Sequence, residues 1–128
     1  MSAPIILYVE DNIANRELVK RVLEVEGYEV IEAQDGPTGL ELAAQRTPDL
    51  ILMDINLPEM DGYAVTAELR KLTSLDKTPI VALTANVMRG DREKSLLAGC
   101  DGYIRKPINI DELPEQIAHF LAGGRETT

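Results

Sequence analysis

The sequence of 128 residues has one cysteine, one histidine and few aromatic residues, and each scarcity excludes a class of protein or site. A single cysteine cannot form an internal disulfide, and one cysteine with one histidine cannot build the usual zinc sites. Aromatic residues make up 4% of the chain and hydrophobic residues 45%, so the core must be packed from aliphatic and small side chains. The length fits one domain with a core of its own.

Basic residues are scarce relative to acidic ones. The chain has 13 lysine and arginine residues against 22 aspartate and glutamate residues, which gives a net charge of −9. Nucleic-acid phosphates need a basic face, so this charge predicts no nucleic-acid partner, and it argues equally against an anionic membrane surface. The sequence also has no secretory signal, lipidation motif or apolar run of about 18 residues, so we expect a cytoplasmic protein with no membrane partner.

Short apolar runs alternate along the chain with stretches of helical periodicity. Most of the runs are continuous, which is typical of strands buried on both faces of a parallel sheet. The alternation predicts an α/β fold of five βα units, a doubly wound five-stranded parallel sheet with the strand order 2-1-3-4-5. The expected strands are Ile5–Val9, Val30–Ala33, Leu50–Met53, Ile80–Leu83 and Tyr103–Ile104.

The helical stretches carry apolar stripes that predict which faces pack on the sheet. In the last helix, Asp111 is the expected N-cap, which would place Pro114 in the first turn, where no intrahelical hydrogen bond is lost. Residues 88–98 have a poor apolar stripe and predict a loosely held helix, a candidate moving part. The expected stripes are Leu18, Val22 and Val25; Leu40, Ala43 and Ala44; Val65, Leu69 and Leu72; and Leu113, Ile117, Phe120 and Leu121.

Charged residues follow three of the expected strands. Glu10 and Asp11 follow the first strand, Asp54 follows the third, and Lys106 follows the fifth. The carboxyl ends of parallel strands meet at one edge, and the switch point between the first and third strands is where such folds bind ligands. Three carboxylates and one ammonium group leave a formal charge of −2, which a divalent cation would neutralise. Carboxylate oxygens suit Mg²⁺, with Mn²⁺ as a possible substitute.

The same residue types predict phosphoryl transfer to a carboxylate. A lysine beside a metal-bound carboxylate is placed to bind a phosphoryl oxygen, and the hydroxyl of Thr84, at the end of the fourth strand, can reach the same group. Asp54 lies alone at the centre of the sheet, so it is the predicted nucleophile, whereas the adjacent Glu10 and Asp11 are predicted to hold the metal. A shift of Thr84 toward the phosphorylated residue would leave space for Tyr103.

Four segments follow one another along the chain: ED at Glu10–Asp11, DINLPEMDG at residues 54–62, LTA at residues 83–85 and GYIRKP at residues 102–107. Together and in this order, they closely resemble the receiver domain of two-component response regulators. The resemblance covers roughly residues 4–122, and the segments around the last two motifs resemble stand-alone regulators of the DivK type and receivers of hybrid histidine kinases. It implies the flavodoxin-like receiver fold over residues 1–122, with residues 123–128 as a short flexible tail.

The resemblance implies a role for each residue of the metal site. Asp54 is the phosphoacceptor, Asp11 binds Mg²⁺ directly, and Glu10 acts through a metal-bound water. The backbone carbonyl of Asn56 is the remaining protein ligand. Asn56 and Asn86 occupy the positions that tune the lifetime of the phosphate by admitting or blocking water.

The resemblance also implies how the signal leaves the site. Thr84 and Tyr103 match the family's switch pair, and Lys106 matches its lysine, with a cis Lys106–Pro107 bond. The implied protein is a single-domain response regulator that takes its phosphoryl group from a histidine kinase or phosphotransfer protein. It catalyses only its own phosphorylation and dephosphorylation. No output domain is expected after the last helix, so a surface around Tyr103 and the last two helices would bind a downstream signalling protein.

Three alternatives stay open on the residues alone. A phosphatase of the haloacid dehalogenase type also uses an aspartate nucleophile with Mg²⁺, threonine and lysine, but it needs a general acid two residues on, where this chain has Asn56. A flavodoxin-like FMN binder needs a phosphate-binding loop after the first strand, where this chain has EDNIAN. A passive binding module with an unused site is the third.

Overall fold

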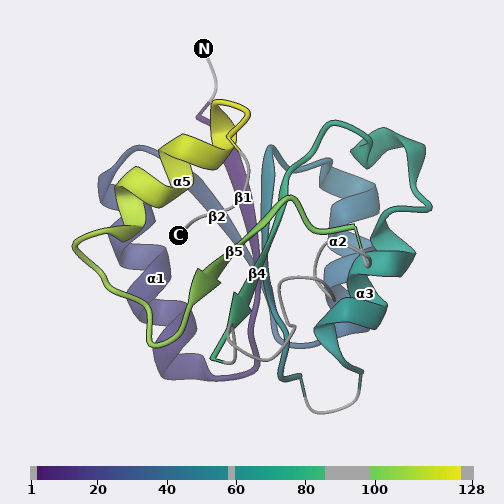
Figure 1. The fold of residues 1–128 in the computed structure, drawn as a ribbon, viewed down its shortest axis with the longest axis horizontal. Coiled ribbons are helices and arrows are strands. Elements are labelled where there is room, and N and C mark those ends of the chain that lie inside the picture. Colours follow the sequence, from purple (N-terminus) through teal and green to yellow (C-terminus); the bar gives the residue numbers. More distant parts are fainter. Residues whose placement is uncertain (1–2, 58–59, 86–98, 125–128) are drawn as a thin grey trace.

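A computed structural model describes residues 3–57, 60–85 and 99–124 as one parallel sheet covered by helices (Figure 1). The sheet has five strands in the order β2-β1-β3-β4-β5. The predicted fold class and strand order are confirmed, and each observed strand extends the predicted one by at most one residue at either end. The strands are β1 (Ile5–Val9), β2 (Glu29–Ala33), β3 (Leu50–Asp54), β4 (Ile80–Thr84) and β5 (Gly102–Arg105).

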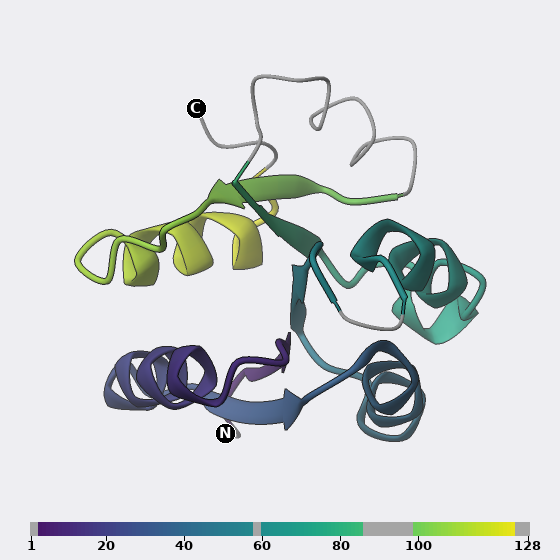
Figure 2. The same cartoon turned by 90° about the horizontal axis from the view of Figure 1, so that it is seen from below.

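Helices cover both faces of the sheet, as Figure 2 shows: α1 and α5 lie on one side, and α2 and α3 lie on the other. Within the described residues, no helix has the length and apolar character needed to cross a membrane. The helix expected over residues 88–98 lies outside the described part of the chain. The helices are α1 (Ile13–Val25), α2 (Gly36–Arg46), α3 (Gly62–Leu69) and α5 (Leu113–Leu121), with a short 3₁₀ helix, η1 (Thr73–Leu75).

Each face of the sheet has its own hydrophobic core, and the strands divide their residues between the two. In β1, Ile6 and Tyr8 pack toward α1 and α5, whereas Leu7 and Val9 pack toward α2 and α3. Successive side chains of a strand point to opposite faces, so both faces need apolar residues when both are covered. This explains why β3 and β4, which are buried at every position, are continuous apolar runs up to their last residues, Asp54 and Thr84.

Helix α1 packs on the sheet through a different face from the predicted one. Val19 and Leu23 are buried and Val22 is partly buried, whereas Leu18 is 49% exposed and Val25 is 84% exposed. The predicted stripe was therefore wrong at Leu18 and Val25. Apolar residues occur at enough positions of this helix that two neighbouring stripes fit the helical period, and only contact with the sheet decides between them.

Helix α2 approaches the sheet through small residues. Ala43 is buried as predicted and Leu40 is partly buried, but Ala44 is exposed. The helix buries Gly39 instead, where an added Cβ would lie 2.8 Å from a methyl group of Val9. The predicted stripe missed this contact because glycine has no side chain to register in a hydrophobic pattern.

Helix α5 begins one residue later than predicted, with Glu112 as the N-cap in place of Asp111. The preceding turn is organised by Asn109, whose side-chain oxygen accepts the backbone N–H of Asp111 at 3.0 Å and whose carbonyl accepts the N–H of Leu113 at 3.0 Å. Asp111 is thereby part of the turn itself. Pro114 still falls in the first turn. The predicted stripe of α5 is confirmed by the burial of Leu113, Ile117 and Phe120, with Leu121 partly buried. In the predicted stripe of α3, Val65 and Leu69 are buried, but Leu72 lies beyond the end of the helix and is partly buried.

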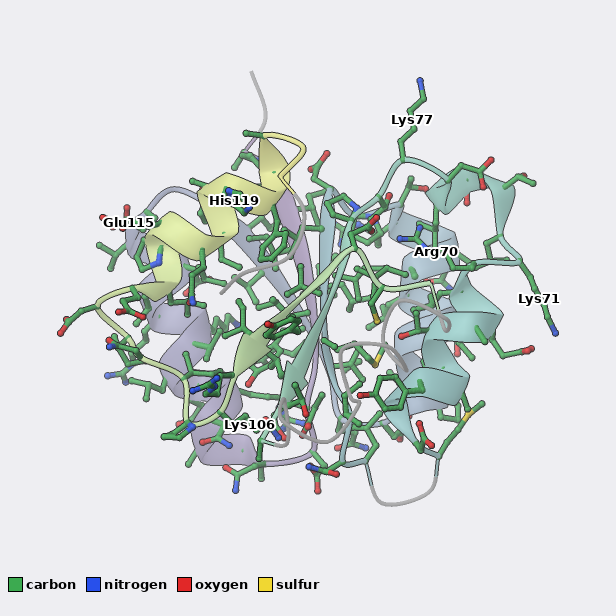
Figure 3. The ribbon with its side chains drawn as sticks, in the orientation of Figure 1. Arg70, Lys71, Lys77, Lys106, Glu115 and His119 are labelled. Carbon is green, nitrogen blue, oxygen red and sulfur yellow. The ribbon has the colours of Figure 1, made fainter. Side chains whose placement is uncertain are left out.

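The start of the edge strand β5 is anchored by Arg70, at the end of α3 (Figure 3). Its guanidinium group donates to the carbonyl of Gly99 at 2.8 Å and to the carboxylate of Asp101 at 2.6 Å. The same carboxylate oxygen accepts the backbone N–H of Ile80, the first residue of β4, at 2.9 Å. These bonds hold the register of β5 against β4 and thereby place the residues that follow β5.

The two leucines of α1 test which face of this helix is buried. We expect Leu23→Ala to lower the free energy of unfolding by about 2–4 kcal/mol, because it leaves a cavity in the core. Leu18→Ala removes the same atoms from a half-exposed site and should cost less than about 1 kcal/mol. Chemical denaturation of both variants measures the difference, and the change in helix propensity is the same in each. Equal losses would contradict the observed orientation of α1.

Candidate functional site

Three strands bring charged residues together at the carboxyl edge of the sheet, which lies at the bottom of Figure 1 and carries Lys106 in Figure 3. Asp54 is the last residue of β3, Glu10 directly follows β1, and Lys106 directly follows β5. Strand alternation puts Glu10 on the face of Tyr8 and Asp54 on the face of Leu52, both toward α1 and α5. The parallel topology therefore assembles the site from residues far apart in the sequence.

Glu10 is 2% exposed and is fixed by the end of β1 and the start of α1. Its Oε1 atom accepts the phenol of Tyr8 at 3.1 Å and the side-chain amide of Asn15 at 3.5 Å. Its Oε2 atom accepts the backbone N–H of Asn12, the N-cap of α1, at 3.3 Å. Arg16 donates to the carbonyl oxygen of Glu10 at 3.0 Å. The glutamate is thus held through both its side chain and its backbone.

Asp54 is also 2% exposed, and two donors hold one of its oxygens. The ammonium group of Lys106 lies 2.5 Å from Oδ1, and the backbone N–H of Asn56 donates to the same atom at 3.0 Å. Charge-assisted hydrogen bonds of this kind are among the strongest in proteins. Asp54 is consequently tied to the end of β5 and to the loop that follows its own strand.

Glu10, Asp11 and Asp54 form an acidic cluster in which one carboxylate oxygen of each residue lies within 4.8 Å of the others. Glu10 and Asp54 are buried and Asp11 is exposed. Three negative charges against the one positive charge of Lys106 leave a formal charge of −2. Oxygen ligands at this spacing and charge suit a hard divalent cation. The structure thus brings the predicted metal-holding residues together.

Burial, followed by the hydrogen bond and the negative charge of Asp54, raises the pKa of Glu10 from 4.5 to about 7. The N–H of Asn12 and the charge of Lys106 act in the opposite sense. Burial, followed by the charge of Glu10, also raises the pKa of Tyr8, so its phenol stays protonated and donates. The raised pKa favours the protonated form of Glu10, which would relieve part of the repulsion among the three acids.

The predicted switch residues are neighbours on the other face of the sheet. Thr84 ends β4 and is 3% exposed. Tyr103 of β5 pairs with Ala82, two residues before Thr84, so the two side chains share a face. The Lys106–Pro107 bond is cis, as the resemblance implied. Asn86, predicted to tune the lifetime of the phosphate, lies outside the described residues.

Sequence reasoning missed the groups that hold Glu10 and an open cavity of about 540 Å³ beside the acidic cluster. Glu10 and Lys106 form polar parts of its wall, and Leu18, Val19 and Ile108 are among its apolar residues. A signal for Tyr8 was present, since it is a polar-tipped residue two positions before Glu10 in an aliphatic strand. No pattern in the sequence indicates the cavity, because its walls come from α1 and from the segment after β5.

Comparison with known proteins decides the family. Residues 6–118 match the family model of the response regulator receiver domain. The chain belongs to this family. It is 42% identical over 116 residues to the polar-differentiation response regulator DivK of Brucella anthropi, covering 91% of this chain and 94% of DivK. The receiver assignment confirms the predicted resemblance, including its DivK-like character, and favours it over the phosphatase and flavodoxin alternatives.

Solved receiver structures agree with the fold of this receiver domain. The chemotaxis response regulator CheY4 of Vibrio cholerae superposes with a TM-score of 0.88 at 30% identity, over 92% of this chain and 98% of that one. The receiver domain of a sensor histidine kinase from Pseudomonas aeruginosa superposes with a TM-score of 0.86 at 38% identity, over 94% and 99% of the two chains. That second structure has a magnesium ion coordinated in its active-site cleft. Receiver domains are signalling modules of two-component systems, and this chain is one of them.

The raised pKa of Glu10 predicts how stability depends on pH when divalent cations are removed. Between its ordinary pKa of 4.5 and about 7, the folded receiver binds more protons at Glu10 than the unfolded chain. The contribution of Glu10 to the free energy of unfolding should therefore be complete below pH 4.5 and be lost as the pH rises through 7, by on the order of 2 kcal/mol.

Denaturation in EDTA across this pH range measures the effect, with Glu10→Gln as the reference because it cannot titrate. The stability of the wild-type receiver relative to Glu10→Gln should fall with rising pH. A difference that is constant or rises with pH would contradict the upward shift of this pKa.

Proposed function

We propose that Asp54 of this receiver accepts a phosphoryl group from a phosphohistidine of a histidine kinase or phosphotransfer protein. The observation that carries the proposal is the contact between Lys106 and Asp54, 2.5 Å from Nζ to Oδ1, inside a cluster of three carboxylates. An acid held beside a cationic donor and two further acids has the parts that phosphoryl transfer needs. We assign the receiver to residues 1–122 and a short tail to residues 123–128, and we place its action in the cytoplasm with its phosphodonor.

The acidic cluster fits a divalent cation, and we propose Mg²⁺, with Mn²⁺ as a possible substitute. Glu10, Asp11 and Asp54 would hold it, together with the backbone carbonyl of Asn56. Their oxygen chemistry, their spacing within 4.8 Å and the excess of three acids over the one lysine support this assignment. When bound, the ion offsets the negative charge of the acids and of the incoming phosphoryl group.

The transfer is a displacement at phosphorus. A carboxylate oxygen of Asp54 forms a bond to phosphorus while the bond from phosphorus to the imidazole nitrogen of the donor breaks, and the nitrogen keeps the electron pair. The acyl phosphate carries about two negative charges where the carboxylate carried one. Lys106, which now pairs with Oδ1 of Asp54, gains a more highly charged partner and would move to a phosphoryl oxygen. The donor histidine would enter through the cavity beside Glu10 and Lys106.

The modified site would act on a partner protein through Thr84 and Tyr103. The hydroxyl of Thr84 would turn toward the phosphoryl group, and Tyr103, which is partly buried against the α2 and α3 side, would move into the space behind it. In this proposal the surface around Tyr103, α5 and the helix expected over residues 88–98 changes, and a downstream signalling protein binds there. Asn56 and Asn86 would set how readily water hydrolyses the acyl phosphate. In this proposal the protein catalyses only its own phosphorylation and dephosphorylation at Asp54.

Asp54→Asn tests the phosphoacceptor. We expect it to abolish the mass increase that acetyl phosphate and Mg²⁺ produce in the wild-type protein, because an amide oxygen is a far weaker nucleophile than a carboxylate. Intact-protein mass spectrometry measures the modification. Asp61→Asn is the matched control, since Asp61 caps α3 at the end of the same loop and asparagine keeps that cap. Full modification of Asp54→Asn would show that the wrong acceptor was named.

Removal of the cation tests the metal site. Mg²⁺ at about 100 times its dissociation constant should stabilise the receiver by about 2.7 kcal/mol relative to EDTA, because it binds the folded state alone. Asp11→Asn should lose most of this gain, since it removes one ligand. Asp76→Asn, an exposed change beside η1, should keep it. Denaturation curves that do not differ between Mg²⁺ and EDTA would contradict the site.

A further inference from the structure

We propose that Tyr8 is a positioning residue of the metal site, which orients Glu10 through its phenolic hydroxyl. The inference rests on the proposed function, because it takes the acidic cluster to hold a divalent cation. It adds a residue that lies outside the motifs from which the site was predicted.

The geometry of β1 brings the phenol of Tyr8 into contact with the carboxylate of Glu10. The two residues are two positions apart at the end of a strand, so their side chains point to the same face. Tyr8 is 0% exposed and Glu10 is 2% exposed, and the phenol donates to Oε1 at 3.1 Å. A buried hydroxyl of this kind cannot turn to bulk water, so its hydrogen bond goes to the carboxylate above it.

The hydrogen bond matters because a glutamate side chain needs more restraint than an aspartate would. It has one more rotatable bond, and rotation of its carboxylate decides which oxygen points toward Asp11 and Asp54. Among the described donors, Oε1 of Glu10 receives the phenol at 3.1 Å and the amide of Asn15 at 3.5 Å, the limit of hydrogen-bond distance. Without the phenol, Oε1 keeps only the weaker of these two contacts. Groups that orient metal-site carboxylates typically change metal affinity by about 10–100-fold when they are removed.

A packing role for the ring of Tyr8 can be separated from this positioning role. The ring belongs to the core cluster between the sheet and helices α1 and α5, and phenylalanine would fill the same space. Tyr8→Phe therefore removes the hydrogen bond and leaves the packing in place. Tyr28→Phe is the matched control, because Tyr28 is partly buried against the same cluster, beside β2 and away from the acids.

Calorimetric titration with Mg²⁺ alone measures the effect on the wild type and both variants. We expect Tyr8→Phe to weaken Mg²⁺ binding by about 3- to 10-fold, less than for a direct partner of a ligand, because Glu10 is expected to act through a metal-bound water. Tyr28→Phe should stay within about twofold of the wild type. Circular dichroism and thermal unfolding establish that each variant is folded.

A double-mutant cycle with Glu10→Asp separates positioning from a general effect of the substitution. Aspartate is one methylene shorter, so we expect its carboxylate not to reach the phenol. Tyr8→Phe should then change Mg²⁺ affinity by less than about twofold in that background. An indirect effect through packing would weaken binding equally in both backgrounds and would overturn the proposal.

The remaining outcomes also decide the question. If the wild type binds Mg²⁺ and Tyr8→Phe binds it equally well, the positioning role is wrong and the proposed function stands. If the folded wild type binds no Mg²⁺ and gains no phosphoryl group from acetyl phosphate, the proposed function fails and this inference fails with it.

Discussion

Repulsion among carboxylates held close together at the end of a parallel sheet is the interaction on which the site depends. Glu10 and Asp54 are almost fully buried, so water screens their charges poorly, and one lysine does not balance three acids. The pairing of Lys106 with Asp54 offsets part of this repulsion, and the raised pKa of Glu10 favours its uncharged form. In the proposed function, a divalent cation and a phosphoryl group each change that balance, so the charge of the site is the quantity that would switch this receiver.

The acidic residues and the predicted switch residues lie on opposite faces of the sheet. Glu10 and Asp54 extend the face that packs on α1 and α5, whereas Thr84 and Tyr103 share the face toward α2 and α3. Tyr103 lies in β5, and Lys106 directly follows this strand, three residues later. A movement of Lys106 would therefore act on the chain close to Tyr103. In the proposed function, a change of charge on one face would therefore be passed to the other through the ends of β4 and β5.

The residues around the acids fix the positions of the charged groups in the site. Tyr8, Asn12 and Asn15 all donate to the side chain of Glu10, and the N-cap of α1 is one of these donors. At the opposite end of β5, the contacts of Arg70 with Gly99 and Asp101 hold the strand that delivers Lys106. The precision of the site thus depends on contacts made outside the motifs that identify the family.

The sequence alone determined the fold class, the strand order and the three acids with their lysine. Continuous apolar runs specify buried parallel strands, and short βα units leave few topologies, so residues that end neighbouring strands must meet. Only the tertiary structure decided which stripe of α1 is buried, how closely Gly39 approaches Val9, and that Tyr8 holds Glu10. These features depend on the angle and distance at which a helix meets the sheet, and on which side chain fills the space above another. The local periodicity of the sequence cannot predict the packing of a helix on the sheet or the contact between two side chains, because both depend on segments that are distant in the chain.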